Sequence, residues 1–192
     1  MLNAASVPDY VALCRSEDRL REIETLFSEA KVAFSNIEYE LDVNSRTANA
    51  QAYARGNARV VRLYGGLAFH PMVGTDTLVF TLLHETGHHF AQGRRFAADP
   101  MLACDCAADE WAVTIGAETL QRVSRRTLDI VKALAGLDAM ILSLSGDLST
   151  LEAQGRFTAA QSCWELDWPT RKSCLSSGRE IAVARRCCGK IR

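Results

Sequence analysis

Apolar residues recur at helical spacing in three stretches of the chain. Residues 16–35 place large apolar side chains three and four positions apart, which predicts an amphipathic helix, and residues 127–144 repeat this pattern. Residues 75–92 form a more apolar helix, in which Thr75 or Asp76 can cap the start and Gly93 is a stop signal. A further helix is expected over residues 105–123.

The segment between the first two of these helices has the pattern of strands. Residues 36–43 alternate apolar with acidic side chains, which is typical of a half-buried strand. Residues 59–64 predict a second strand, ended by the pair Gly65-Gly66, whereas the Ala-rich residues 45–57 fit a connection or an irregular strand. The order of elements predicts an α+β fold with a small antiparallel or mixed sheet and a mainly helical C-terminal half.

Length and composition indicate one globular domain. The chain has 192 residues, of which 48% are hydrophobic and 23% charged. We therefore treat residues 1–192 as a single domain, with residues 146–192 as a Cys-rich segment packed on it. The formal net charge of -1 argues against a nucleic-acid partner, which needs a concentrated basic face. No uncharged stretch near the candidate site is long enough to span a membrane.

The chain has seven cysteines, an odd number, so at least one thiol is free or pairs with another molecule. Such density is typical of secreted domains in an oxidising compartment, but the first 20 residues lack the pattern of a signal peptide. The compartment stays open between a mature secreted or periplasmic protein and an intracellular one with reduced thiols. The candidate disulfide cysteines are Cys104, Cys106, Cys163, Cys174, Cys187 and Cys188.

Residues 84–88 read His-Glu-Thr-Gly-His and lie within the apolar predicted helix. Residues four apart share one helix face, so His84 and His88 can bind one metal ion through their imidazole nitrogens. Glu85 is rotated by about 100° from His84, so it misses the metal but reaches a water molecule there. A carboxylate in this place acts as general base when the water attacks a carbonyl. The motif predicts a catalytic zinc centre.

Two neighbours of these residues are interpreted structurally. Gly87 allows another backbone to approach the helix closely. His89 points about 100° away from His88, and we interpret it as a residue that supports the ligands, caps the helix or lies at the surface.

A catalytic zinc needs a third protein ligand and an open fourth position. Because no histidine follows His89 and the inverted motif is absent, a downstream carboxylate is the remaining option. Asp105 and Asp109 are four apart in the next predicted helix. We assign Asp105 as the third ligand and Asp109 as the acceptor of a hydrogen bond from a ligand histidine. The alternatives are an N-cap role for Asp105, a solvated Asp109, or ligation by Cys104 or Cys106.

The sequences HETGHH and, 17 residues after His88, DCAADEWA together resemble the compact gluzincin branch of zinc metallopeptidases. In that branch a helix with HExxH is followed by one with ExxADxxA. The resemblance covers about residues 59–112 and implies a zincin-like fold with one zinc ion. The implied ligands are His84, His88 and Asp105, with Glu85 as general base and Asp109 as the orienting acid. The strand before the motif would be the edge that binds substrate.

The chain departs from the family pattern in two places. Asp105 is one methylene shorter than the usual glutamate, so its helix must approach the metal more closely. There is also no His or Tyr after residue 89 to stabilise an oxyanion. The upstream candidates are Tyr64, which ends the strand before the motif, and His70; an arginine of the C-terminal half is another. The alternatives are a core role for Tyr64 and a loop role for His70.

We therefore predict a zinc-dependent metallopeptidase that cleaves a peptide or protein substrate by a zinc-activated water, with Glu85 as general base. The substrate would lie along residues 59–64 by edge pairing. The alternative is a non-catalytic zinc-binding protein with the same fold, such as a pseudo-peptidase, sensor or regulator. The two departures from the family pattern favour that alternative.

Overall fold

The computed structural model describes residues 15–93, 95 and 99–145. Helix α2 (Glu17–Ala33) comes first, and its N-cap Ser16 accepts a hydrogen bond from the N–H of Arg19. Three strands follow, β1 (Ile37–Asp42), β2 (Ala50–Arg55) and β3 (Ala58–Tyr64). Their order in the sheet is β1-β3-β2, with β1 parallel and β2 antiparallel to β3. The predicted α+β class with a small mixed sheet is confirmed.

Strand β3 lies in the centre of the sheet, so the expectation that residues 59–64 form an edge is wrong. The reason is that residues 50–55 form a regular strand, which pairs with β3 through a hairpin at Gly56-Asn57. Gly56 has φ +61°, and glycine tolerates such a conformation at the start of a tight turn. The edges of the described sheet are therefore β1 and β2.

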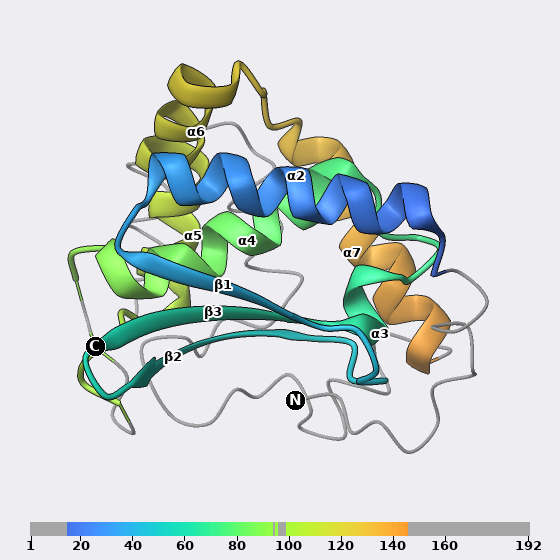
Figure 1. Cartoon of the computed structure of the whole chain (residues 1–192), viewed down its shortest axis with the longest axis horizontal. Helices are drawn as coiled ribbons and strands as arrows, with labels where there is room; N and C mark the ends of the chain where they lie inside the picture. Colours follow the sequence, from blue (N-terminus) through green and yellow to red (C-terminus); the bar gives the residue numbers. More distant parts are fainter. Residues whose placement is uncertain (1–14, 94, 96–98, 146–192) are drawn as a thin grey trace.

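The helices α2 and α4 (Thr75–Phe90) lie on the same side of the sheet (Figure 1). Helix α2 contacts β1, whereas α4 contacts β2 and β3. All residues of α4 from Thr77 to His89 are buried. Helix α7 (Ile130–Ser145) packs against α4 on its other side. Helix α4 is thus enclosed by its neighbours, and its seven buried polar side chains need partners within the fold.

The start of α4 differs from the predicted cap. Its N-cap is Gly74, which has no side chain to cap the helix. Thr75 instead donates to Glu22 on α2, and a carboxylate oxygen of Asp76 accepts the N–H of Asp129, just before α7. The residues expected to cap α4 therefore tie it to α2 and to the start of α7.

The predicted helix over residues 105–123 is divided into three parts. These are α5 (Asp105–Trp111), the π-helical segment η2 (Ala112–Gly116) and α6 (Ala117–Ser124). The pair Gly65-Gly66 begins a further short helix, α3 (Gly65–Ala68), directly after β3. The Cys-rich segment 146–192 lies outside the described residues, and so do four of its candidate disulfide cysteines, Cys163, Cys174, Cys187 and Cys188.

Helices α4 and α5 approach each other closely at Gly87, as the sequence predicts. A Cβ atom added at Gly87 would lie 2.8 Å from the carbonyl oxygen and 3.0 Å from the Cα atom of Ala108. Real Cβ atoms essentially never approach other atoms below 3.0 Å. The absence of a side chain at Gly87 is therefore what allows α5 to reach its position.

Gly87→Ala is expected to destabilise the protein, even though alanine favours a helix more than glycine does. The added methyl group meets backbone atoms that cannot rotate aside, and overpacking of this kind costs about 1–3 kcal/mol. Gly74→Ala is the matched control, because an added Cβ there has nothing within 4 Å. Urea unfolding compares the two variants, and equal free energies of unfolding would contradict the interpretation.

Candidate functional site

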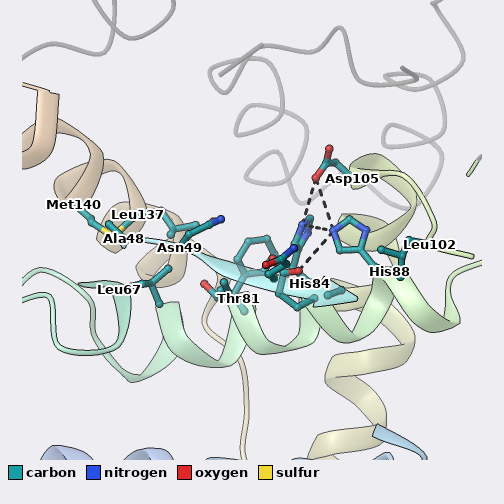
Figure 2. A pocket seen from close by; sticks show the side chains of 15 residues that line it. Ala48, Asn49, Leu67, Thr81, His84, His88, Leu102, Asp105, Leu137 and Met140 are labelled. Carbon is teal, nitrogen blue, oxygen red and sulfur yellow. Dashed lines mark hydrogen bonds and ion pairs between the residues drawn. The ribbon is translucent and has the colours of Figure 1, made fainter. Parts of the chain in front are cut away.

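The structure brings together three predicted ligands, His84 and His88 on α4 and Asp105 at the start of α5 (Figure 2). The Nε2 atoms of the two histidines are 3.1 Å apart. Oδ1 of Asp105 lies 3.5 Å from Nε2 of His84 and 3.9 Å from Nε2 of His88. A circle through the three atoms has a radius of about 2 Å, close to the roughly 2.0–2.2 Å of zinc–ligand bonds. The three side chains therefore fit a single metal ion.

The opposite nitrogen of each ligand histidine is held by an acceptor. Nδ1 of His84 donates to Oδ1 of Asp109 at 2.7 Å, and Nδ1 of His88 donates to the carbonyl of Ala103 at 2.7 Å. We assign these donors because a carboxylate and a carbonyl only accept. In the neutral imidazoles, both Nε2 atoms then present lone pairs toward the same point. This is the tautomer that metal binding through Nε2 requires.

The surrounding carboxylates favour a positive charge on the pair of imidazoles of His84 and His88. Burial disfavours the charged form of His84, but the carboxylates of Asp109, Asp105 and Glu85 outweigh it and raise the pKa of His84 to about 10. Burial lowers the pKa of His88, and the charge on His84 lowers it further. Without a metal, therefore, a proton on His84 supplies the positive charge that the carboxylates attract.

Glu85 lies next to the ligand group without belonging to it. Its Oε2 atom is 4.0 Å from Nε2 of His88, and its side chain is 12% exposed. Both Glu85 and the ligands line one cavity of about 340 Å³. A carboxylate in this place can reach a molecule that enters the cavity and still leave the metal position to the other three side chains.

The cavity has three distinct walls. The helices α4 and α5 supply the polar end with the ligands and Glu85. The wall beside the sheet consists of β2 and the residues before it, namely Ala48, Asn49, Ala50, Gln51 and Ala52. Apolar side chains form the far end, where Leu67 of α3 faces Leu137 and Met140 of α7 (Figure 2).

The structure does not bring Tyr64 to this cavity. Val61 and Leu63 of β3 face the hydrophobic core, and side chains alternate along a strand, so Tyr64 points to the opposite face of the sheet. There its hydroxyl donates to Oε1 of Gln51 at 2.9 Å. A catalytic role for Tyr64 has no geometric support in this structure.

The remaining two histidines have structural partners. His70 is buried, its Nδ1 accepts the N–H of Met72, and its Nε2 lies 2.9 Å from the hydroxyl of Ser143 on α7. Nε2 of His89 donates to the carbonyl of Val60 in β3 at 3.0 Å. Burial lowers the pKa of both imidazoles. Both therefore fasten elements together, outside the ligand group.

Cys104 and Cys106, on either side of Asp105, are both disulfide-bonded. A sulfur in a disulfide has no thiolate form, so neither residue offers a thiolate to the metal here. Asp105 is thus the ligand that this segment can provide, and the cysteines anchor the backbone on both sides of it.

Sequence reasoning missed several contributors to the site. The alternation of alanine with polar residues in β2 has the period of a half-buried strand, and this signal could have revealed the cavity wall. The spacing of Thr81, three residues before His84, places it on the cavity-lining face of α4. The carbonyl of Ala103 leaves no sequence signal, because every residue type has one.

Comparison with protein-family models, curated proteins and solved structures finds no match for this chain. Within the described residues, no helix has both the length and the apolar character needed to cross a membrane.

In the metal-free protein, His84 is expected to stay protonated at pH 8, whereas the other three histidines are neutral. Its protonation stabilises the fold fully below about pH 6.5, and this contribution disappears as the pH rises through about 10. Asp109→Asn should lower the pKa of His84, because it removes the strongest attraction to the charged imidazole. NMR titration of the ring resonances measures both effects, with Asp18→Asn as an exposed control. A wild-type His84 that titrates near 6.5 would refute this account.

Proposed function

We propose that the protein is a zinc-dependent metallopeptidase of compact gluzincin type, with a zincin-like fold. One observation carries the proposal. The Nε2 atoms of His84 and His88 face each other at 3.1 Å, while their Nδ1 atoms are engaged by Asp109 and Ala103. Two neutral imidazoles in this arrangement would repel each other, so the contact needs a cation, which is the proton on His84 in the metal-free protein and would be the metal ion in the loaded one. Histidine nitrogens with one carboxylate oxygen are a donor set that suits catalytic zinc.

The chemistry that zinc supplies when bound is polarisation of a carbonyl and acidification of a water molecule. His84, His88 and Asp105 would hold the metal, and Asp109 fixes the ring of His84. Glu85 accepts the proton of the attacking water and later donates it to the leaving amine. This assignment is supported by the position of Glu85 in the cavity beside the ligands.

The substrate is proposed to pair with β2 rather than with β3. The N–H of Tyr64 donates to the carbonyl of Asn49, so residue 49 turns its backbone groups toward β3. Backbone direction alternates in an antiparallel ladder, and Ala50 and Ala52 therefore turn theirs toward the outer edge. No described strand pairs with β2 on that side. An extended peptide added there would pass beside the metal ligands.

A non-catalytic zinc-binding protein is the second candidate. The observation that favours it is the lining of the cavity, which contains no Tyr, Lys or Arg among the described residues. An oxyanion would have to rely on a neutral donor such as the side-chain amide of Asn49. Such donors do serve as oxyanion stabilisers in hydrolases, so this lining is compatible with a peptidase as well.

Glu85→Gln is expected to abolish peptide hydrolysis and to leave one zinc ion per chain. The amide keeps the size of the side chain but cannot accept a proton from water. Zinc content and cleavage of unfolded casein are measured together, with Glu118→Gln as an exposed control. Undiminished cleavage by a pure Glu85→Gln preparation would overturn the mechanism. One bound zinc without any cleavage by the wild type would instead support the non-catalytic candidate.

Zinc affinity is expected to depend on the length of residue 105. Because α5 is held against α4 at Gly87, the position of its backbone suits the shorter aspartate. Asp105→Asn should weaken zinc binding at least about 10-fold, since the neutral amide is a poor ligand. Asp105→Glu should also bind more weakly than the wild type, although glutamate is usual in gluzincins. Competition with a chelator measures both constants, and tighter binding by Asp105→Glu would contradict the packing argument.

A further inference from the structure

Thr81 on α4 carries a hydroxyl that is buried and has no hydrogen-bond partner. The residue as a whole is 8% exposed. Other threonine hydroxyls in helical segments behave differently, because those of Thr25, of Thr86 on α4 itself and of Thr114 all donate to the carbonyl four residues earlier. Buried polar groups without partners are rare and call for an explanation. A ligand that completes the hydrogen bonding is one explanation, provided that Thr81 lies where a ligand can reach.

Thr81 does lie on the wall of the cavity (Figure 2). It precedes His84 by three residues and Glu85 by four, so it shares their helix face at a distance of about one turn, or 5.4 Å. Threonine in a helix populates two χ1 wells, so rotation about χ1 can turn its hydroxyl toward a group that enters the cavity. Thr81 thus lies on the part of α4 between the polar end of the cavity and its apolar end.

We propose that Thr81 is a specificity-determining residue, which hydrogen-bonds an uncharged polar side chain on the substrate residue beside the cleaved bond. This inference rests on the peptidase function proposed above. A hydroxyl both donates and accepts, so it can pair with an amide or with another hydroxyl.

The lining of the cavity excludes acidic side chains from this position. Leu67, Leu137 and Met140 surround the space next to Thr81, and no Lys or Arg is among the described lining residues. An ionised carboxylate there would lose its hydration without gaining a positive counter-charge, and it would also face the carboxylate of Glu85 in the same cavity. An amide would instead place its carbon chain on apolar surface and its polar atoms on the hydroxyl of Thr81.

Three amino-acid hydroxamates test this assignment, because the side chains of asparagine, leucine and aspartate have nearly the same shape. The hydroxamate group anchors each compound on zinc, and calorimetry compares their affinities for zinc-loaded protein. The wild type should bind asparagine hydroxamate about tenfold more tightly than leucine hydroxamate, the effect of one hydrogen bond to a buried group. Aspartate hydroxamate should bind most weakly.

Thr81→Val is isosteric and should remove the preference for asparagine over leucine, whereas Thr25→Val, on the distant helix α2, should retain it. Equal preferences in the two variants would overturn the proposal.

The melting temperature of ligand-free Thr81→Val is a second readout, independent of the metal. It should equal or exceed that of the wild type, because no internal hydrogen bond is lost. A decrease of several degrees would show that the hydroxyl has an internal partner and would also overturn the proposal.

Acetohydroxamate, which has no side chain, separates failure of this inference from failure of the proposed function. If it binds none of the proteins, the proposed metal site is wrong. The comparison then measures NMR chemical shifts of methyl-labelled methionines on addition of asparaginamide or leucinamide. Met140 lines the cavity, whereas Met72 and Met101 are exposed and serve as controls. A chemical-shift change of the Met140 methyl group that is larger with asparaginamide than with leucinamide, and that is lost in Thr81→Val, would support the assignment. Shifts that are the same in Thr81→Val would refute it.

Discussion

The approach of α5 to α4 at Gly87 is the constraint on which the rest of the site depends. The absence of a side chain at this position lets the backbone of Ala108 lie against α4. The first residue of α5, Asp105, then joins the candidate ligand group, and Asp109 of the same helix accepts the hydrogen bond from His84. Because α5 lies this close to α4, the short side chain of Asp105 comes within 4 Å of both histidines. The aspartate of the proposed ligand group and the glycine in the motif thus both fit one packing arrangement.

The same approach creates a concentration of buried charge. Glu85, Asp105 and Asp109 converge on two imidazoles in a largely water-excluded region. Buried carboxylates are costly unless a cation compensates them, and in the metal-free fold a proton on His84, whose pKa these carboxylates raise, would supply that cation. A proton and a metal ion therefore compete for the same electrostatic role. Binding of the proposed metal at neutral pH would release the proton on His84, so its affinity would rise with pH until His84 has lost that proton.

The sequence was most informative where geometry is local. The i and i+4 spacings within one helix placed His84 with His88 and Asp105 with Asp109, because the backbone of a helix determines which residues share a face. It was less informative about the sheet. Alanine has a low strand propensity, which obscured β2, and the order of strands depends on long-range pairing. The expectation that Tyr64 faces the metal depends on β3 being an edge strand. Because β2 occupies that edge, Tyr64 contacts Gln51 of β2 instead.

The helices that form the two ends of the cavity, α5 and α7, pack against α4 through separate contacts. The polar end depends on α5, whereas the apolar end depends on α7, which packs close to α4 because Gly136 leaves room for the hydroxyl of Thr77. That hydroxyl donates to the carbonyl of Ala133, and Asp76 accepts a backbone N–H just before α7. Substitutions on the inner face of α7 can therefore reshape what the cavity accepts while the ligand group stays in place. This separation of a fixed chemical centre from an adjustable wall is how one fold accommodates different substrates.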